Sequence, residues 1–157
     1  NFKNIINDLM NVYYKYADGD GEYGYRTERF YRRYQRENYQ NPDKWSLEEE
    51  NRQLEKYKFH IALIEDLILE LTRAANYICD KIREYIFEGF RLEEGALLVM
   101  RGDLMKSQTF RVEYREGQRT DYPYPSLREF MTIRNERDLQ IGEGIEVDYF
   151  RKMPWDE

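Results

Sequence analysis

Apolar residues recur at three- and four-residue steps through most of the first half of the chain, which is the spacing of amphipathic helices. The clearest stretch begins at Ser46, where Ser46-Leu47-Glu48-Glu49 has the form of a capping box: a Ser oxygen for the free amides and a Glu three residues later that reaches back. No Gly or Pro follows before Gly89. The sequence therefore predicts a helix over 46–88, about 65 Å long at 1.5 Å per residue.

The apolar positions of this helix form a heptad-spaced stripe, called the seam below. Its steps alternate between three and four without a slip, as in coiled coils, and Leu67, Ala74 and Ile86 widen it. Because such patterns beyond about 25 residues are typical of coiled coils and bundles, we expect the seam to be an association surface. The alternative is an ordinary core helix, covered on this face by the first helix and the sheet. The seam residues are Leu54, Tyr57, Ile61, Ile64, Ile68, Leu71, Ala75, Ile78, Ile82 and Tyr85.

Two shorter helical segments precede the long helix. Apolar spacing predicts a first helix over 2–16, which Asp18-Gly19-Asp20-Gly21 ends as a turn. The Arg/Tyr-rich segment 23–39 follows and is expected to be helical from about Thr27.

After Gly89 the pattern changes to that of strands. The apolar run 96–100 and the alternation over 110–114 and 145–149 predict strands, and Ser126 resembles the cap of a short helix from Leu127 to about Asn135. The sequence thus predicts an α+β fold: one long heptad-patterned helix plus shorter helices, with a small, mostly antiparallel sheet in the C-terminal half. We expect a single domain, 1–157, with a helical half (1–89) and a sheet half (90–157).

Composition narrows the function classes. A chain of 157 residues with 41% hydrophobic and 36% charged residues can bury a core without disulfides. The single cysteine, Cys79, excludes an internal disulfide and a multi-Cys zinc site, and the single histidine, His60, excludes a His-rich metal site. The longest apolar run, 67–71, is interrupted by Glu70, so no membrane span is expected. We expect a cytoplasmic protein with no cofactor and no metal.

The Arg/Tyr segment is a candidate site for phosphate or nucleic acid. Guanidinium groups pair with phosphates, and tyrosine rings offer stacking faces. Acidic neighbours dilute its charge, and the net charge of the chain is −6, so the alternative is a solvated helix whose Arg groups pair with carboxylates. The candidate residues are Arg26, Arg29, Arg32, Arg33, Arg36, Tyr31 and Tyr34.

Other candidate chemistry is incomplete. A calcium loop counted from Asp18 would need Gly at position 6 and Glu at position 12, where Tyr23 and Arg29 stand, so an acidic turn is favoured over a looser oxygen site. On one straight helix His60 lies too far from Cys79 to activate it.

Four carboxylates interrupt the apolar part of the long helix. Facing carboxylates could do acid–base work or hold a hard cation. The favoured alternative is ion pairing at three-residue spacing, Glu70 with Arg73 and Asp80 with Arg83. The carboxylates are Glu65, Asp66, Glu70 and Asp80.

Together these patterns predict a non-catalytic, homo-oligomeric binding or regulatory module that associates through the long helix, as a dimer. A further partner would be another protein or a phosphate-containing ligand, with Tyr122, Tyr124, Tyr149 and Trp155 lining a pocket. The alternative function is nucleic-acid or nucleotide-phosphate binding by segment 23–39. An enzyme would require carboxylates that converge across the oligomer.

Overall fold

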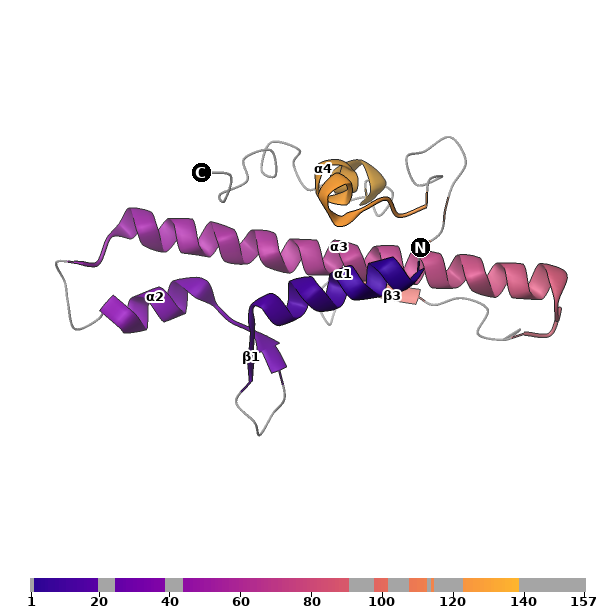
Figure 1. Ribbon diagram of the computed structural model, residues 1–157, viewed down its shortest axis with the longest axis horizontal. Coiled ribbons are helices and arrows are strands. Elements are labelled where there is room, and N and C mark those ends of the chain that lie inside the picture. Colours follow the sequence, from indigo (N-terminus) through magenta and orange to yellow (C-terminus); the bar gives the residue numbers. More distant parts are fainter. Residues whose placement is uncertain are drawn as a thin grey trace. The chain divides into compact units, whose positions relative to one another are not determined.

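The computed structural model describes residues 2–19, 25–38, 44–90, 98–101, 108–112, 114 and 123–138. Within them the chain forms four helices: α1 (Phe2–Lys15), α2 (Phe30–Asn38), α3 (Leu47–Tyr85) and α4 (Leu127–Asp138) (Figure 1). Strands β1 (Ala17–Gly19) and β2 (Tyr25–Thr27) form one antiparallel pair. Strands β3 (Leu98–Arg101) and β4 (Gln108–Arg111) form another, with Leu98 opposite Arg111.

The predicted α+β fold is wrong for the described part of the chain, which is mostly helical. Its strands are three or four residues long and form two separate two-stranded ribbons, so no sheet in these residues supplies a face for a core. Helical side chains supply most of the core instead. The expected strand over 145–149 lies outside the described residues.

The long helix is confirmed, and α3 runs unbroken for 39 residues (Figure 1). Only half of the predicted capping box forms. The backbone N–H of Glu49 donates to Ser46 Oγ at 3.5 Å, while the N–H of Ser46 donates to the Tyr34 hydroxyl at 2.9 Å rather than to Glu49. Tyr34 of α2 therefore takes the place of the reciprocal carboxylate and ties α2 to the start of α3.

The other helix boundaries follow the predictions closely. α1 ends one residue before the expected 16, and Asp18-Gly19 belongs to β1 rather than to the expected turn. At the start of α4, the N–H of Glu129 donates to Ser126 Oγ at 3.4 Å. Apolar spacing therefore located α1, and the Ser126 cap located the start of α4.

The described residues divide into two compact units. The first contains residues 2–8 and 66–138, and the second contains residues 9–65, so the division falls within α1 and within α3. The predicted single domain stays a prediction.

The first unit buries both an apolar core and a cluster of charged side chains. Tyr124 and Phe130 pack with ring centroids 5.2 Å apart, and the Tyr124 hydroxyl donates to Asp8 at 2.8 Å. Burial, together with this hydrogen bond, raises the pKa of Tyr124 far above its usual value, so the phenol stays protonated. The buried apolar side chains are Ile5, Leu67, Leu69, Ala74, Val112, Tyr124 and Phe130.

The charged cluster joins α3 to α4. Arg137 donates to both carboxylate oxygens of Glu70 at 2.7 Å, and Arg73 also donates to Glu70. Arg134 donates to Asp66 at 2.6 Å. All five side chains are at least 95% buried, so each charge depends on its partner, because a buried charge without one costs several kcal/mol.

The second unit packs around aromatic rings. Phe59, His60 and Leu63 of α3 are buried. The ring of Tyr16 lies 4.8 Å from His60 and 4.6 Å from Phe30. α2 therefore packs beside the N-terminal half of α3 through edge-to-face ring contacts (Figure 1).

We predict that Glu70→Gln lowers the free energy of unfolding by about 3–5 kcal/mol, because it removes the negative charge of a buried carboxylate that accepts hydrogen bonds from both Arg137 and Arg73. Urea denaturation measures this change. Glu37→Gln is the matched control, because Glu37 pairs with Arg33 on the exposed surface and its loss should matter far less. Equal effects of the two substitutions would refute the structural role of the buried cluster.

Candidate functional site

The seam lies on the side of α3 that does not pack into the core. None of its ten residues is buried: Ile68, Ile78 and Tyr85 are exposed and the other seven are half-buried. The buried residues of α3 form a second stripe at helical spacing, which is roughly opposite to the seam at 3.6 residues per turn. This second stripe consists of Phe59, His60, Leu63, Asp66, Leu67, Leu69, Glu70, Arg73, Ala74 and Asn76.

Since no seam residue is buried, the structure does not favour the alternative in which the rest of the chain fully covers this face of the helix. Leu67 and Ala74, expected to widen the seam, belong to the buried stripe instead. Contact with α2 is confined to the N-terminal half, where the Tyr57 ring lies 6.0 Å from Phe30 and 5.9 Å from Tyr31.

The Arg/Tyr segment supplies α2, and its candidate residues are divided among different environments. Tyr31 packs on Tyr57, and the Tyr34 hydroxyl donates to the carbonyl of Lys44 at 3.0 Å. Arg33 is neutralised by Glu37 at 2.8 Å and by Glu28 at 3.3 Å. Arg26 lies in β2, and its side chain falls outside the described part of the structure.

Three other guanidinium groups of this segment differ from that of Arg33 in their ion pairing. Arg29, Arg32 and Arg36 are exposed and form no ion pair with any described residue. With a spacing of three and four residues, they lie along one side of α2 and of the residue directly before it. These three, rather than the full candidate set, are available to an anion.

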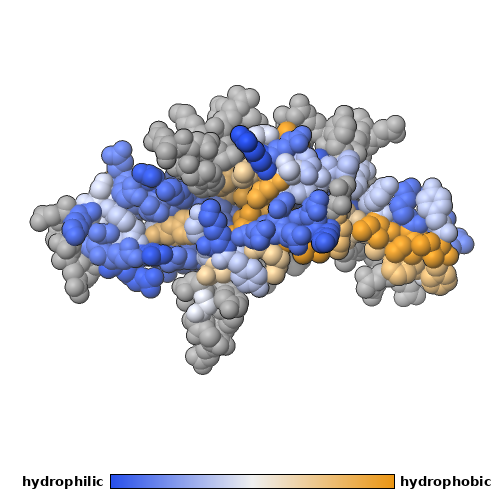
Figure 2. Space-filling view, in the orientation of Figure 1, coloured by the Kyte–Doolittle hydropathy of each residue, from blue (hydrophilic) through white to orange (hydrophobic). Residues whose placement is uncertain are grey.

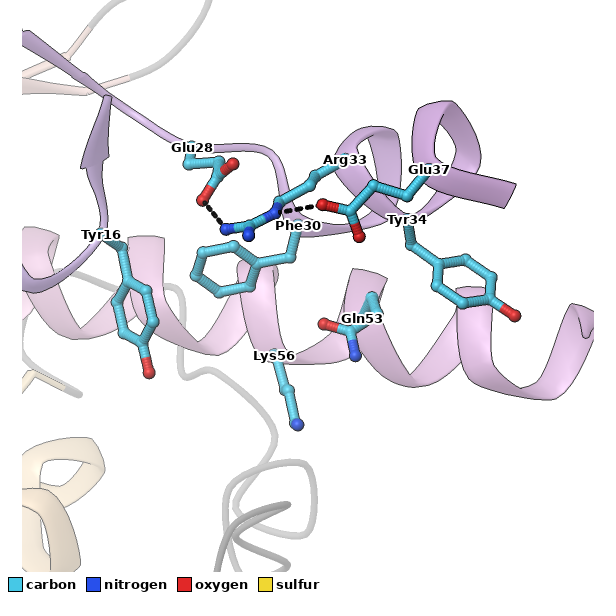
Figure 3. A pocket seen from close by; sticks show the side chains of 8 residues that line it. All are labelled: Tyr16, Glu28, Phe30, Arg33, Tyr34, Glu37, Gln53 and Lys56. Atoms are coloured by element: carbon cyan, nitrogen blue, oxygen red, sulfur yellow. Dashed lines mark hydrogen bonds and ion pairs between the residues drawn. The ribbon is translucent and has the colours of Figure 1, made fainter. Parts of the chain in front are cut away.

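An open groove of about 320 Å³ lies between α2 and α3 in the second unit. Figure 3 shows Arg33 held between Glu28 and Glu37 above the ring of Phe30. Because the carboxylates here already neutralise Arg33, the groove does not have the positive character that a phosphate site needs. Its lining consists of Tyr16, Glu28, Phe30, Arg33, Tyr34, Glu37, Gln53 and Lys56.

His60 is a core residue of the second unit. It is 3% exposed, and its Nε2 has no hydrogen-bond partner in the described part of the chain. Burial, with a smaller contribution from the positive charge of Lys15, lowers the pKa of His60 to about 4. The imidazole is therefore neutral at physiological pH and is surrounded by the rings of Tyr16 and Phe30.

The predicted ion pairs within α3 are confirmed. Arg73 pairs with Glu70, and Arg83 pairs with Asp80 at 2.5 Å. Among the described residues no group of three or more His, Cys, Asp or Glu side chains is arranged to hold a metal ion. Cys79 is half-buried and is not part of a disulfide.

Several expectations from the C-terminal half are corrected or untested. Tyr124 is 2% exposed and its hydroxyl donates to Asp8, so it packs in the core of the first unit, while the predicted aromatic pocket stays a prediction. Tyr122, Tyr149 and Trp155 lie outside the described residues. Arg134 and Arg137 were not anticipated, although two carboxylates in the most apolar part of α3 were a signal that guanidinium partners exist elsewhere.

The chain matches no protein-family model, no curated protein and no solved structure. Among the described residues no helix has both the length and the apolar character required to cross a membrane.

We predict that His60 makes the fold sensitive to acid. Its pKa is about 4 in the folded chain and near 6.5 in the unfolded chain, so its contribution to stability is full above pH 6.5 and is lost as the pH falls towards 4. The loss is at most about 3 kcal/mol. His60→Phe should reduce the fall in urea stability between pH 7 and pH 4.5, while carboxylate titration remains in both proteins. If the two proteins lose stability in parallel, His60 is not buried in its neutral form.

Proposed function

We propose that this chain is a non-catalytic binding or regulatory module that forms a homo-oligomer through the seam of α3. The single observation that supports it is that the seam is not buried: a regular apolar stripe runs along α3 from Leu54 to Tyr85, with three of its ten residues exposed and seven half-buried. Apolar stripes that a chain leaves accessible are typical of protein–protein interfaces.

The heptad spacing favours a second copy of the chain as the partner. Knobs-into-holes packing requires a facing helix with the same spacing over the same length. The other described helices have 14, 9 and 12 residues, too short to match a stripe that extends from Leu54 to Tyr85. A second α3 has the required pattern, and symmetric dimers are the commonest oligomers.

We predict that the full chain is a dimer or larger and that Ile78→Asp shifts it towards the monomer, because a carboxylate in an apolar interface loses its hydration. The expected increase in the dissociation constant is at least about tenfold. Size-exclusion chromatography with light scattering over a range of concentrations measures it.

Met10→Asp is the matched control for this substitution. Met10 is 42% exposed and Ile78 is 41% exposed, both on helices, but only Ile78 belongs to the seam. A wild-type chain that stays monomeric, or equal dissociation by both substitutions, would contradict the proposed function.

A second candidate function is binding of a nucleic acid or nucleotide phosphate by the Arg/Tyr segment. It is favoured by one observation, the exposure of Arg29, Arg32 and Arg36 without an ion pair to any residue that the structure describes. The acidic net charge of −6 opposes it, since the chain as a whole repels phosphate backbones.

This candidate predicts that Arg32→Ala together with Arg36→Ala weakens binding of a single-stranded oligonucleotide and reduces the salt slope by about one unit per lost phosphate contact. Fluorescence anisotropy at several salt concentrations measures both. Arg33→Ala is the control on the same helix, because Glu28 and Glu37 already neutralise that side chain. If the double substitution changes neither affinity nor salt slope, phosphate binding by α2 is refuted.

A further inference from the structure

Among the described residues of the first unit, the most exposed large apolar side chains lie at the C-terminal end of α3. Figure 2 shows strongly hydrophobic residues gathered at this end, at the right of the view. Five exposed side chains of residues 77–87 are together called the apolar tip below, and two of them lie just beyond the last helical residue. They are Tyr77 (50% exposed), Ile78 (41%), Tyr85 (72%), Ile86 (79%) and Phe87 (61%). One of the five, Tyr77, also packs edge-to-face on Tyr114 with ring centroids 5.7 Å apart.

Hydrogen bonds hold the end of the helix that carries the apolar tip. The backbone N–H groups of Ile86 and Phe87 both donate to the carbonyl of Ile82 at 2.9 Å. Arg83 donates to the carbonyl of Phe90 at 3.2 Å, which fixes the turn after the helix. The apolar side chains are therefore presented by ordered backbone, and association would not have to order this segment first.

The apolar tip supplies a large part of the area that a stable interface needs. Tyr77 lies on the opposite side of the helix from Ile86, so only the other four side chains can face one partner together. Their exposed fractions equal about two and a half whole side chains, on the order of 500 Å² because large aromatic side chains bury 150–250 Å² each. A standard interface buries roughly 800 Å² per partner. The half-buried seam residue Ile82, which lies within the same segment, contributes part of the difference.

The charge of the segment favours a second copy over a polyanion or an anionic membrane. Between Tyr77 and Phe87 the charged residues are two acids and two bases, in the pairs Lys81–Glu84 at 2.7 Å and Arg83–Asp80 at 2.5 Å. The segment is thus neutral on a chain whose net charge is −6. Anionic partners require an excess of positive charge, whereas two neutral apolar segments can meet without repulsion.

We propose that the apolar tip is the centre of self-association, so that residues 77–87 of one copy pack against the same segment of a second copy. This inference rests on the proposed function and narrows it from the whole seam to one end of α3. The N-terminal half of the seam contributes less, because Tyr57 is already packed against Phe30 and Tyr31.

The test compares two substitutions in the full chain by light scattering over a range of concentrations. Ile86 lies in the apolar tip but outside the heptad seam, and Ile64 lies in the seam but outside the apolar tip. Ile86→Asp is expected to raise the dissociation constant at least about tenfold more than Ile64→Asp does. Because Ile86 is 79% exposed, the substitution leaves the monomer fold intact.

A second measurement does not depend on any substitution folding correctly. A nitroxide attached to Cys79, the only cysteine, reports the distance between two copies. Pairing at the apolar tip places the two labels within roughly 20 Å, because packed helices lie 8–10 Å apart. Antiparallel pairing centred on Ile61 would separate them by roughly 50 Å.

The possible results distinguish a failure of the assignment to the apolar tip from a failure of the proposed self-association. A monomeric wild-type chain overturns both. A dimer that Ile64→Asp dissociates as strongly as Ile86→Asp, or a label separation above roughly 40 Å, leaves self-association standing and overturns its assignment to the apolar tip.

Discussion

The pairing of two carboxylates on α3 with two guanidinium groups on α4 determines which side of α3 faces the core of the first unit. Asp66 and Glu70 are one helical turn apart, as are Arg134 and Arg137, so both pairs form only when these two faces meet. A rotation of α3 about its axis would leave buried charges without partners, at a cost of several kcal/mol. Electrostatics therefore fixes the inward side, and the apolar seam is on the other side as a consequence.

This arrangement reverses the usual amphipathic helix, in which the most regular apolar stripe faces the core. The buried stripe of α3 includes Asp66, Glu70, Arg73 and Asn76, and the Asn76 amide donates to the carbonyl of Val112 at 2.8 Å. Each of these four polar side chains forms a hydrogen bond or an ion pair. The buried stripe can therefore pack well only against surfaces that supply those partners. The seam is apolar and, apart from the contact of Tyr57 with Phe30 and Tyr31, no ring–ring contact to it is seen among the described residues. Its spacing suits a helix like itself.

The sequence was sufficient to predict the helices but not the contacts between segments that are far apart in the chain. Spacing and caps located α1, α3 and α4 within a few residues, and the Glu70–Arg73 and Asp80–Arg83 pairs followed from local separation. The partners of Asp66 and Glu70 lie more than sixty residues away on α4, and no local pattern identifies them. Likewise, the alternation over 110–114 overlaps β4 only at residues 110 and 111, and it could not show that β4 would pair with only one other described strand, β3.

The two ends of the seam differ in how much association can stabilise them. The hydrophobic gain is proportional to the apolar area that is still in water. In the second unit the rings of Phe30 and Tyr31 already shield Tyr57, so part of that gain is realised within the chain. Near the other end Tyr85 is 72% exposed and Ile86 is 79% exposed. In the proposed self-association the end of α3 would therefore contribute more hydrophobic free energy per residue than Tyr57 does.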